Sequence, residues 1–395
     1  MPTTDQYWAL PDGISEALPD ESWRLESLRR SLLDLYATWG YQMVMPPLVE
    51  YMQSLSTGLG SNLDVQTFKV TDQLTGRMMG IRADMTPQIA RIDAHKLKTE
   101  HPNRLCYIGS VLRTRAFHDD GSRSPLQVGA ELFGHAGEDS DFEVLALLLA
   151  TLEYCQVPGI TLDIGHVGIF RSLAAQAGLS TAQEKTFFDM LERKSLPEID
   201  AWLDAAALPA EVTAMLWQLP RLYGAPDVLD KAAGVLSAAQ ADVKAALAYL
   251  QSLVARLQAE FPSCTLHVDL TELSGYDYHT GIVYAAYAHG SGREIARGGR
   301  YDGIGKLFGR ARPATGFSTD LRLLARHQGT SSPPSSRIFA PADPDPRLAS
   351  TIAALRQQGE CVVRQLQGDT VKTPQDAACD RQLVRQGTEW IVTEV

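Results

Sequence analysis

The stretch "YIGSVLRTRAFHDDGSRSPLQVGAELFG", residues 107–134, places a polar segment between two runs of β-forming residues. "RLCYIGSVLRTR" at 104–115 and "LQVGAELFG" at 126–134 are rich in branched and aromatic residues and alternate over part of their length, which predicts two strands. The glycine and the polar residues of the segment between them, 116–124, favour a mobile loop. Gln127 and Glu131 are an even number of residues apart, so we expect both on one face of the second strand.

Strands and helices are both expected around this stretch. Residues 20–40 predict an amphipathic helix, because leucines recur at helical spacing from Leu25 to Leu35 and Gly40 can end it. "DSDFEVLALLLATLEYCQ" predicts a helix that is buried on most of its surface. Other runs are typical of strands, namely "RMMGIRAD", "GITLDIGHVGIF" and "TLHVDLTEL". "YQMVMPPLVEY" predicts a short strand stopped by Pro46 and Pro47.

The composition changes twice along the chain. Residues of about 180–260 are rich in Ala and Leu and predict a helical insertion, with a stripe that runs from Val243 to Leu257. Residues 328–337 are rich in Ser, Pro and Gly and predict a linker. We therefore expect a main domain at 1–327 and a short α/β domain at 338–395, which is small for an independent core.

Composition limits the function classes. A net charge of −11 weighs against broad binding to a phosphate backbone. The scattered cysteines predict reduced residues and neither a disulfide framework nor a metal site. We see no apolar run long enough to span a membrane and no secretory signal, so we expect a cytoplasmic protein.

Polar residues in four strand-like stretches suggest one small-molecule pocket. "GIRADMTPQIAR" offers Asp84 and Thr86, and a carboxylate there suits a cationic group such as an α-amino group. The others are 107–134, "ELSGYDYHTGIVYAAY" at 272–287, and "GGRYDG" at 298–303. Taken singly, Asp84 is equally well explained as a helix N-cap, Glu131 as a surface charge and His279 as a core histidine. Together, at these intervals, the stretches favour a binding pocket.

The layout of these motifs resembles the catalytic domain of class II histidyl-tRNA synthetases over residues 8–325. "YQMVMPPLVEY" is similar to the dimer-forming first motif, 107–134 to the second, "YDYHTGIVY" to a histidine-binding signature and "GGRYDG" with "ATGFSTDL" to the approach to the third. The resemblance implies an α+β fold with an antiparallel sheet, flanking helices, a helical insertion and a truncated C-terminal unit resembling part of an anticodon-binding domain. It also implies self-association as a dimer.

The resemblance further implies a set of histidine-binding residues. Asp84, Thr86, Gln127 and Glu131 are expected at the amino end of the ligand, while Tyr278 and His279 are expected near its ring. Arg113 stands at the place of the arginine of the second motif.

Departures from the synthetase pattern argue against catalysis. Ser274 stands where the histidine signature has an arginine, and Leu323 where the third motif has the arginine that stacks on ATP. Asp320 replaces a glycine of that motif, and Arg115 replaces a glutamate of the second. ATP handling is thus expected to be lost while the amino-acid contacts persist, so we expect no catalytic residues, metal or cofactor.

The chain therefore resembles the histidyl-tRNA synthetase-like regulatory subunits of ATP phosphoribosyltransferase. The resemblance implies a short-form catalytic subunit as partner in a hetero-octamer, a role in the first step of histidine biosynthesis, and histidine as inhibitory effector. The acidic charge and short C-terminal unit argue against tRNA binding. The alternatives are an active histidyl-tRNA synthetase and another histidine-binding paralogue.

Overall fold

The computed structural model describes residues 8–56, 64–116, 121–272, 275, 278–328, 336–368 and 370–395. The chain divides into two compact units, one of residues 1–17 and 25–329 and the other of residues 18–24 and 330–395.

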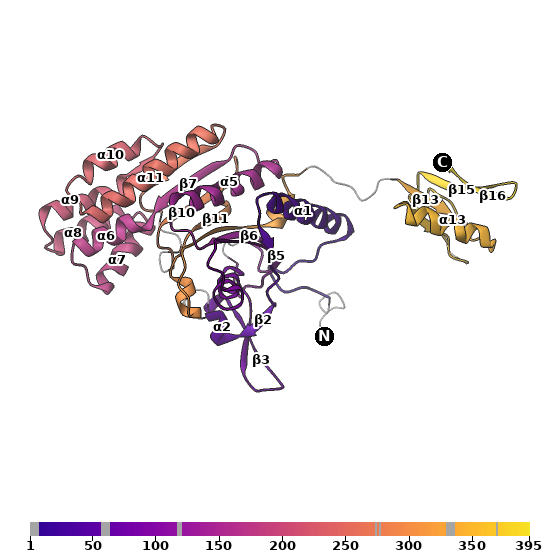
Figure 1. Cartoon of the computed structure of the whole chain (residues 1–395), viewed down its shortest axis with the longest axis horizontal. Coiled ribbons are helices and arrows are strands. Elements are labelled where there is room, and N and C mark those ends of the chain that lie inside the picture. The colour runs from indigo at the N-terminus through magenta and orange to yellow at the C-terminus, as the bar shows by residue number, and fades with distance from the viewer. Residues whose placement is uncertain are drawn as a thin grey trace. The chain divides into compact units, whose positions relative to one another are not determined.

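A nine-stranded sheet is the centre of the first unit, with the strand order β1-β5-β6-β12-β11-β10-β7-β9-β8 (Figure 1). The pairs β1–β5 and β7–β9 are parallel, and the other six neighbouring pairs are antiparallel. Its strands are β1 (Gln42–Met43), β5 (Asn103–Ser110), β6 (Leu126–Phe133), β7 (Thr161–His166), β8 (Tyr223–Gly224), β9 (Thr265–Asp269), β10 (Ile282–Tyr287), β11 (Glu294–Arg300) and β12 (Ala314–Asp320). The α+β class expected from the sequence, with a largely antiparallel sheet, is confirmed.

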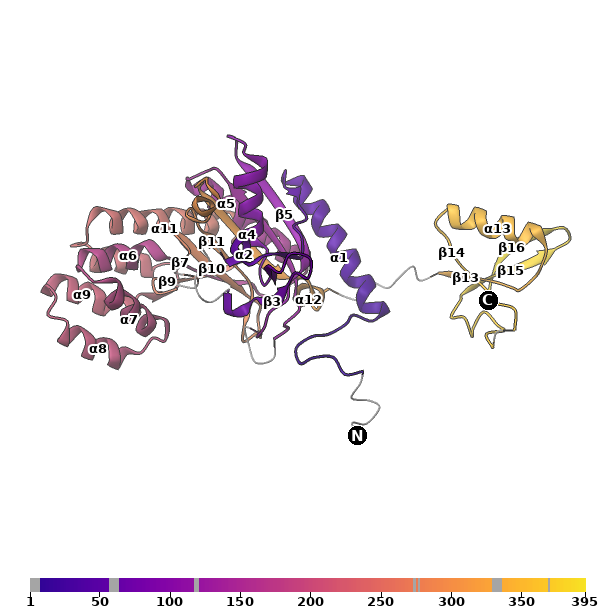
Figure 2. The same ribbon diagram turned by 90° about the horizontal axis from the view of Figure 1, so that it is seen from below.

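Long helices pack on this sheet and form the main hydrophobic core with it (Figure 2). Leu145, Leu148 and Leu152 of α5 are fully buried, as expected for the apolar segment "DSDFEVLALLLATLEYCQ". The helices outside the insertion are α1 (Pro19–Thr38), α2 (Met52–Ser56), α4 (Thr86–Arg91), the π-helix η2 (Ile92–Leu97), α5 (Glu138–Tyr154), α6 (Val167–Gln176), the 3₁₀-helix η4 (Ile304–Phe308) and α12 (Leu321–Ala325).

Residues 181–260 are almost entirely helical and form a group beside α6 (Figures 1 and 2). The first helix starts at a capping box in which Ser180 and Gln183 satisfy each other's backbone N–H groups. The elements are α7 (Thr181–Glu192), α8 (Leu196–Ala205), α9 (Ala210–Gln218), the 3₁₀-helix η3 (Leu219–Arg221), β8, α10 (Val228–Val235) and α11 (Ala241–Glu260).

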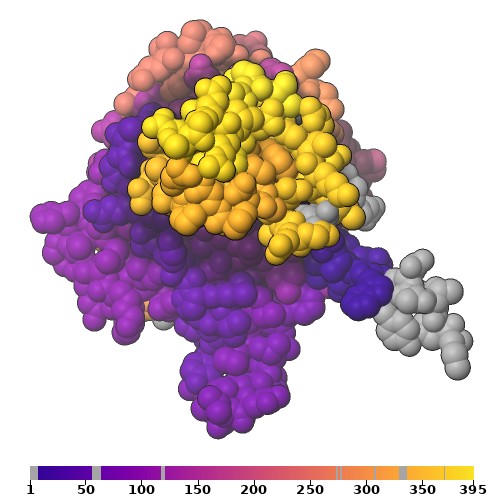
Figure 3. Space-filling model, turned by 90° about the vertical axis from the view of Figure 1, so that its right-hand side faces the viewer, coloured from indigo at the N-terminus to yellow at the C-terminus, as the bar shows by residue number. Residues whose placement is uncertain are grey.

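A small antiparallel sheet of order β2-β4-β3 carries a projecting hairpin. Its strands are β2 (Val49–Tyr51), β3 (Phe68–Thr71) and β4 (Met78–Ile81). The hairpin forms the protrusion at the bottom of Figure 3, and Leu74 in its turn is 95% exposed. Met45 and Met78 are also exposed apolar residues of this region.

The C-terminal unit has a four-stranded sheet of order β14-β13-β15-β16 packed on one helix. Ile338, Leu348, Ile352 and Leu383 lie in its core. The elements are β13 (Arg337–Ala340), α13 (Pro346–Gln357), β14 (Cys361–Arg364), β15 (Arg381–Gln386) and β16 (Glu389–Glu394).

One strand prediction was wrong in detail, and another was confirmed. "GITLDIGHVGIF" was expected as one strand, but β7 ends at His166, whose ring accepts the N–H of Gly168 and so starts α6. The short strand expected in "YQMVMPPLVEY" before Pro46 and Pro47 is confirmed as β1, and the residues after the prolines form β2 of a different sheet. In the described part of the chain, no helix is both long and apolar enough to cross a membrane.

Candidate ligand-binding site

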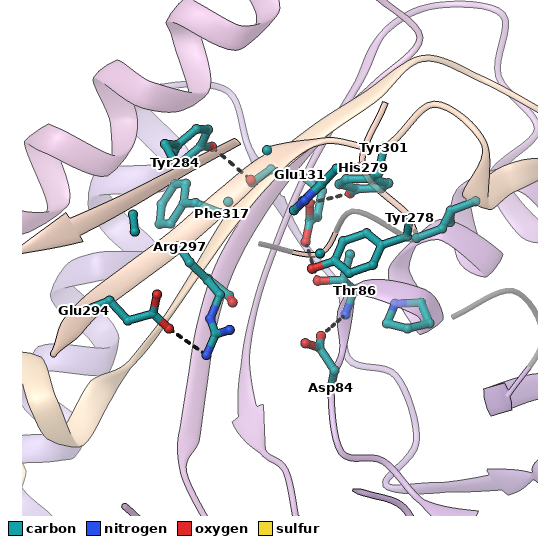
Figure 4. Close-up of a pocket in the computed structure, with 18 of the residues that line it drawn as sticks. Asp84, Thr86, Glu131, Tyr278, His279, Tyr284, Glu294, Arg297, Tyr301 and Phe317 are labelled. Atoms are coloured by element: carbon teal, nitrogen blue, oxygen red, sulfur yellow. Dashed lines mark hydrogen bonds and ion pairs between the residues drawn. The ribbon is translucent and has the colours of Figure 1, made fainter. Parts of the chain in front are cut away.

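A cavity of about 230 Å³ lies against the large sheet, where the start of α4 approaches it together with Gly275, Tyr278 and His279 (Figure 4). Its wall includes residues of β6, β10, β11 and β12, which are neighbours in the sheet. Polar and aromatic side chains from segments far apart in sequence therefore face one space.

The start of α4 is hydrogen-bonded to Gln127 of strand β6. The Asp84 carboxylate accepts the Thr86 N–H at 2.8 Å and the Gln127 Nε2 at 3.2 Å. The other end of the Gln127 amide accepts the N–H of Met85 at 2.9 Å. Asp84 thus helps to start the helix and lines the cavity at the same time.

The carboxylate of Glu131 lies at the floor of the cavity and is held by three hydroxyl groups. Thr86 Oγ1 and Tyr107 OH each donate to Oε1 at 2.9 Å, and Tyr301 OH bonds to Oε2. Glu131 is only 1% exposed, and this burial raises its pKa to about 8 in spite of the three donors. The carboxyl group is therefore poised to change its charge near neutral pH.

A glycine opposite Glu131 makes room for it. Gly316 of β12 pairs with Glu131 of β6 across the sheet. A Cβ atom at position 316 would collide with the Glu131 carboxylate and would also lie 2.8 Å from the carbonyl oxygen of Ala130. Glycine is thus required here by close approach, as in strands where a group must lie against the backbone.

Two aromatic residues and one arginine form another part of the wall. The rings of Tyr278 and His279 have centroids 4.2 Å apart, and both residues line the cavity. Burial raises the pKa of Tyr278 to about 12. Arg113 Nε donates to the carbonyl oxygen of Ala83 at 3.2 Å, and burial lowers the pKa of its guanidinium to about 10.

An ion pair stands on strand β11 at the cavity wall. Arg297 Nη2 lies 2.7 Å from Glu294 Oε1, and the two side chains are 38% and 18% exposed. Figure 4 shows Arg297 reaching from its strand toward the space that Asp84 also faces. Nearby, Tyr284 OH donates to the carbonyl oxygen of Gly316 at 2.9 Å.

The structure brings the seven predicted residues together around one cavity. The lining includes Asp84, Thr86, Arg113, Glu131, Tyr278 and His279. Gln127 stands behind Asp84 and contacts the cavity only through it. Gln127 and Glu131 both contact the segment 84–86, so their predicted common face is confirmed.

Sequence reasoning missed several residues of the site. They are Tyr107, Tyr284, Glu294, Arg297 and Tyr301. Tyr301 lies within the "GGRYDG" stretch, whose glycines were the available indication that it belongs to the site. The others stand on strands whose partners the sequence does not reveal.

The positions that depart from the synthetase pattern have their own contacts. Asp320 accepts the N–H groups of Leu126 and Arg322 at 3.1 and 3.0 Å and caps helix α12. Arg322 reaches away to the carbonyl oxygen of Ser15. Ser274 and residues 117–120 of the expected mobile loop lie outside the described residues. Within the described ranges, no group of three or more His, Cys, Asp or Glu residues is arranged to hold a metal ion.

Two family models match consecutive parts of the chain. Residues 13–324 match the model of histidyl-tRNA synthetase, and residues 335–393 match that of the ATP phosphoribosyltransferase subunit HisZ C-terminal domain. Among curated relatives, the ATP phosphoribosyltransferase regulatory subunit of Thioalkalivibrio sulfidiphilus is 55% identical over 398 residues, with 100% of both chains covered. That of Alkalilimnicola ehrlichii is 51% identical and covers 98% of this chain and 97% of its own.

Solved structures have the same fold. A crystal structure of an ATP phosphoribosyltransferase regulatory subunit/histidyl-tRNA synthetase from Bacillus halodurans superposes with a TM-score of 0.80 at 28% identity, covering 94% of this chain and 95% of that one. A histidyl-tRNA synthetase from Nostoc sp. PCC 7120 superposes with a TM-score of 0.77 at 19% identity, covering 95% and 91%. The second likeness concerns the fold alone.

Proposed function

We propose that this chain, which belongs to the family of ATP phosphoribosyltransferase regulatory subunits, senses histidine in the cavity described above and thereby controls its catalytic partner. The chain is a regulatory subunit and not an enzyme by itself. A regulatory subunit requires a catalytic partner, and we propose the short-form catalytic subunit of the first step of histidine biosynthesis.

The observation that carries the histidine proposal is a pair of carboxyl groups at two depths of one cavity. Asp84 stands at the start of α4, while Glu131 lies on the floor among Thr86, Tyr107 and Tyr301. Histidine presents an ammonium group and an imidazole N–H, and both are donors that suit a carboxylate. Asp84 and Glu131, with aromatic walls beside them, match a ligand with two separated donors.

We divide the two carboxyl groups between the two ends of the ligand. Asp84, oriented by Gln127, takes the ammonium group, with Thr86 beside it. Glu131, which the sequence suggested for the amino end, is assigned instead to the imidazole, because tyrosine hydroxyls surround it and Tyr278 and His279 line the same cavity. Arg113 completes the set as a cation at the wall.

Ligand analogues test this division by calorimetry. Asp84→Asn is expected to weaken binding of histidine by roughly 1.5–3 kcal/mol, because a charged hydrogen bond is lost. The same variant should bind imidazole propionate, which lacks the ammonium group, as well as the wild type does. If Asp84→Asn weakens both ligands equally, Asp84 does not hold the ammonium group.

Co-expression with a short-form catalytic subunit tests the function as a whole. We expect phosphoribosyltransferase activity to require this chain, and added histidine to lower that activity. Activity that is independent of this chain would contradict the supporting role. Activity that needs the chain but is insensitive to histidine would contradict the sensing role alone.

We further propose that the chain works in the cytoplasm, dimerises through the region of β1 to β4, forms a hetero-octamer with its catalytic partner and binds no tRNA. Met45, Leu74 and Met78 of this region are large apolar residues exposed on the single chain, and a dimer interface there would bury them. An active synthetase is the alternative, but Asp320 is occupied as a helix cap at the third motif. Histidine-dependent exchange of pyrophosphate into ATP would support that alternative, and we expect none.

A further inference from the structure

Two arginines line the cavity, and they differ in what they contact. Arg113 is tied to the backbone at Ala83. Arg297 extends from β11 and is held on one side by Glu294 at 2.7 Å. In Figure 4 the guanidinium of Arg297 faces the same open space as Asp84, from the opposite wall.

We propose that Arg297 holds the α-carboxylate of the bound amino acid and that Glu294 positions its guanidinium; this rests on the proposed histidine site. A guanidinium has N–H donors on several edges, so an arginine that contacts Glu294 can also take a carboxylate through two parallel hydrogen bonds. Lysine would offer charge without this planar fork.

The charges of the wall fit a zwitterion. An amino acid carries its ammonium and carboxylate groups on one carbon atom, so a site needs an acid and a base facing one small volume. Asp84 and Arg297 meet this condition, and the charges of both act on the phenol of Tyr278. Burial raises the pKa of this phenol, the charge of Asp84 raises it further and that of Arg297 lowers it.

Glu294 gives the arginine a fixed direction. Its side chain is 18% exposed, so it is partly shielded from water, whereas the Arg297 side chain is 38% exposed. The two residues stand three positions apart on β11, and the register of β11 shifts at Glu294, which pairs with Tyr287. Without Glu294, the long side chain of Arg297 would be expected to sample more conformations toward solvent, and binding would lose its preorganised partner.

The proposal predicts selectivity for a free carboxylate, which calorimetry with histidine and histidinol can measure on the full chain. Histidinol retains the ammonium group and the ring but has an alcohol in place of the carboxylate. Wild type should bind histidine about 10- to 100-fold more tightly than histidinol, the range expected for charged hydrogen bonds. In Arg297→Ala, histidine binding should fall to the histidinol level while histidinol binding is unchanged.

Two further variants sharpen the test. Arg297→Lys should recover only part of the selectivity, and Glu294→Gln should reduce it less than Arg297→Ala does, because the guanidinium remains. Arg293→Ala is the matched control, since Arg293 precedes β11, is not part of the cavity lining and carries the same charge. Circular dichroism and thermal unfolding establish that each variant is folded.

The outcomes separate this inference from the proposed function. If Arg297→Ala keeps wild-type selectivity, or weakens histidine and histidinol equally, Arg297 does not hold the carboxylate. If histidine binding then still depends on Asp84, the histidine site stands and only this inference falls. If the wild type binds no histidine, the proposed sensing function falls and the inference falls with it.

Discussion

Asp141 in the first turn of α5 and Glu131 on β6 are both carboxylates inside the first unit, with exposed fractions of 0% and 1%. Arg300 donates to Asp141 through Nε at 3.0 Å and through Nη2 at 2.9 Å. Tyr249 of α11 also bonds to Asp141. The charge of Asp141 is therefore matched by a fixed cation of the protein.

The surroundings of Glu131 are different. In the part of the chain that the structure describes, its partners are the hydroxyls of Thr86, Tyr107 and Tyr301, and it forms no ion pair. Hydroxyls stabilise a carboxylate less than an arginine does, and burial raises the pKa of Glu131 to about 8. A buried acid paired with arginine holds the fold, while one held by hydroxyls can respond to a ligand.

The largest effect on stability is expected when Asp141 is neutralised. Asp141→Asn would leave Arg300 only the partly exposed Asp302, 3.2 Å from its Nη1, as a counterion, which should lower the free energy of unfolding by up to about 3–5 kcal/mol. Urea unfolding followed by circular dichroism measures this loss. A loss below about 1 kcal/mol, the range of exposed pairs, would show that Arg300 finds other compensation.

Glu131→Gln should affect binding and spare the fold. The amide retains a carbonyl oxygen for Thr86 and Tyr107, and at neutral pH it replaces a carboxyl group that is largely protonated. We expect little change in the urea midpoint and a loss of roughly 1.5–3 kcal/mol in histidine binding. Unchanged histidine affinity by calorimetry would remove Glu131 from the site.

The raised pKa predicts a pH dependence of binding. A ligand that donates to the Glu131 carboxylate favours its ionised form, so binding releases a proton whenever the free site is protonated. Histidine affinity should therefore rise with pH up to about 8 and then level off, with a slope of at most about tenfold per unit. Titrations of Glu131→Gln over the same range remove the contribution of the ligand's own groups, and a wild-type slope equal to that of the variant would contradict the prediction.

The smallest effect is expected two residues before Asp141. Asp139 bonds to Arg256 at 2.7 Å, but its side chain is 79% exposed. Asp139→Asn should change the free energy of unfolding by about 0–1 kcal/mol, because water screens the pair. Urea unfolding of Asp139→Asn and Asp141→Asn side by side compares an exposed and a buried ion pair in the same turn of α5. Similar losses of unfolding free energy in the two variants would show that burial makes no difference.

Much of the fold follows from local pattern. The helix of residues 19–38 and the strands β5, β6 and β9 were indicated by periodicity and by β-forming residues. The change from strand to helix after His166 was not, since a short apolar run fits both structures and the deciding contact is a ring nitrogen with the N–H of Gly168. Such a contact depends on geometry that spacing does not encode.

The site was predictable where one strand carried both members of a pair. Gln127 and Glu131 share a face of β6 by simple alternation. Tyr107 reaches Glu131 because β5 and β6 pair with Leu105 opposite Glu131, and Tyr301 reaches it from the position directly after β11. Strand register sets these contacts, and local sequence does not specify the register between distant strands.

Gly316 suggests how such a sensor could be lost in evolution. A change of this glycine to alanine adds one methyl group at the floor of the pocket, against the Glu131 carboxylate. Gly316 is buried, so such a change leaves the outer surface of the molecule untouched. Under the proposed histidine-sensing function, a lineage that gains from constitutive synthesis could lose feedback through this single substitution and keep the subunit as a partner of the catalytic chain. Laboratory strains selected for histidine overproduction are a natural place to look for substitutions at this position.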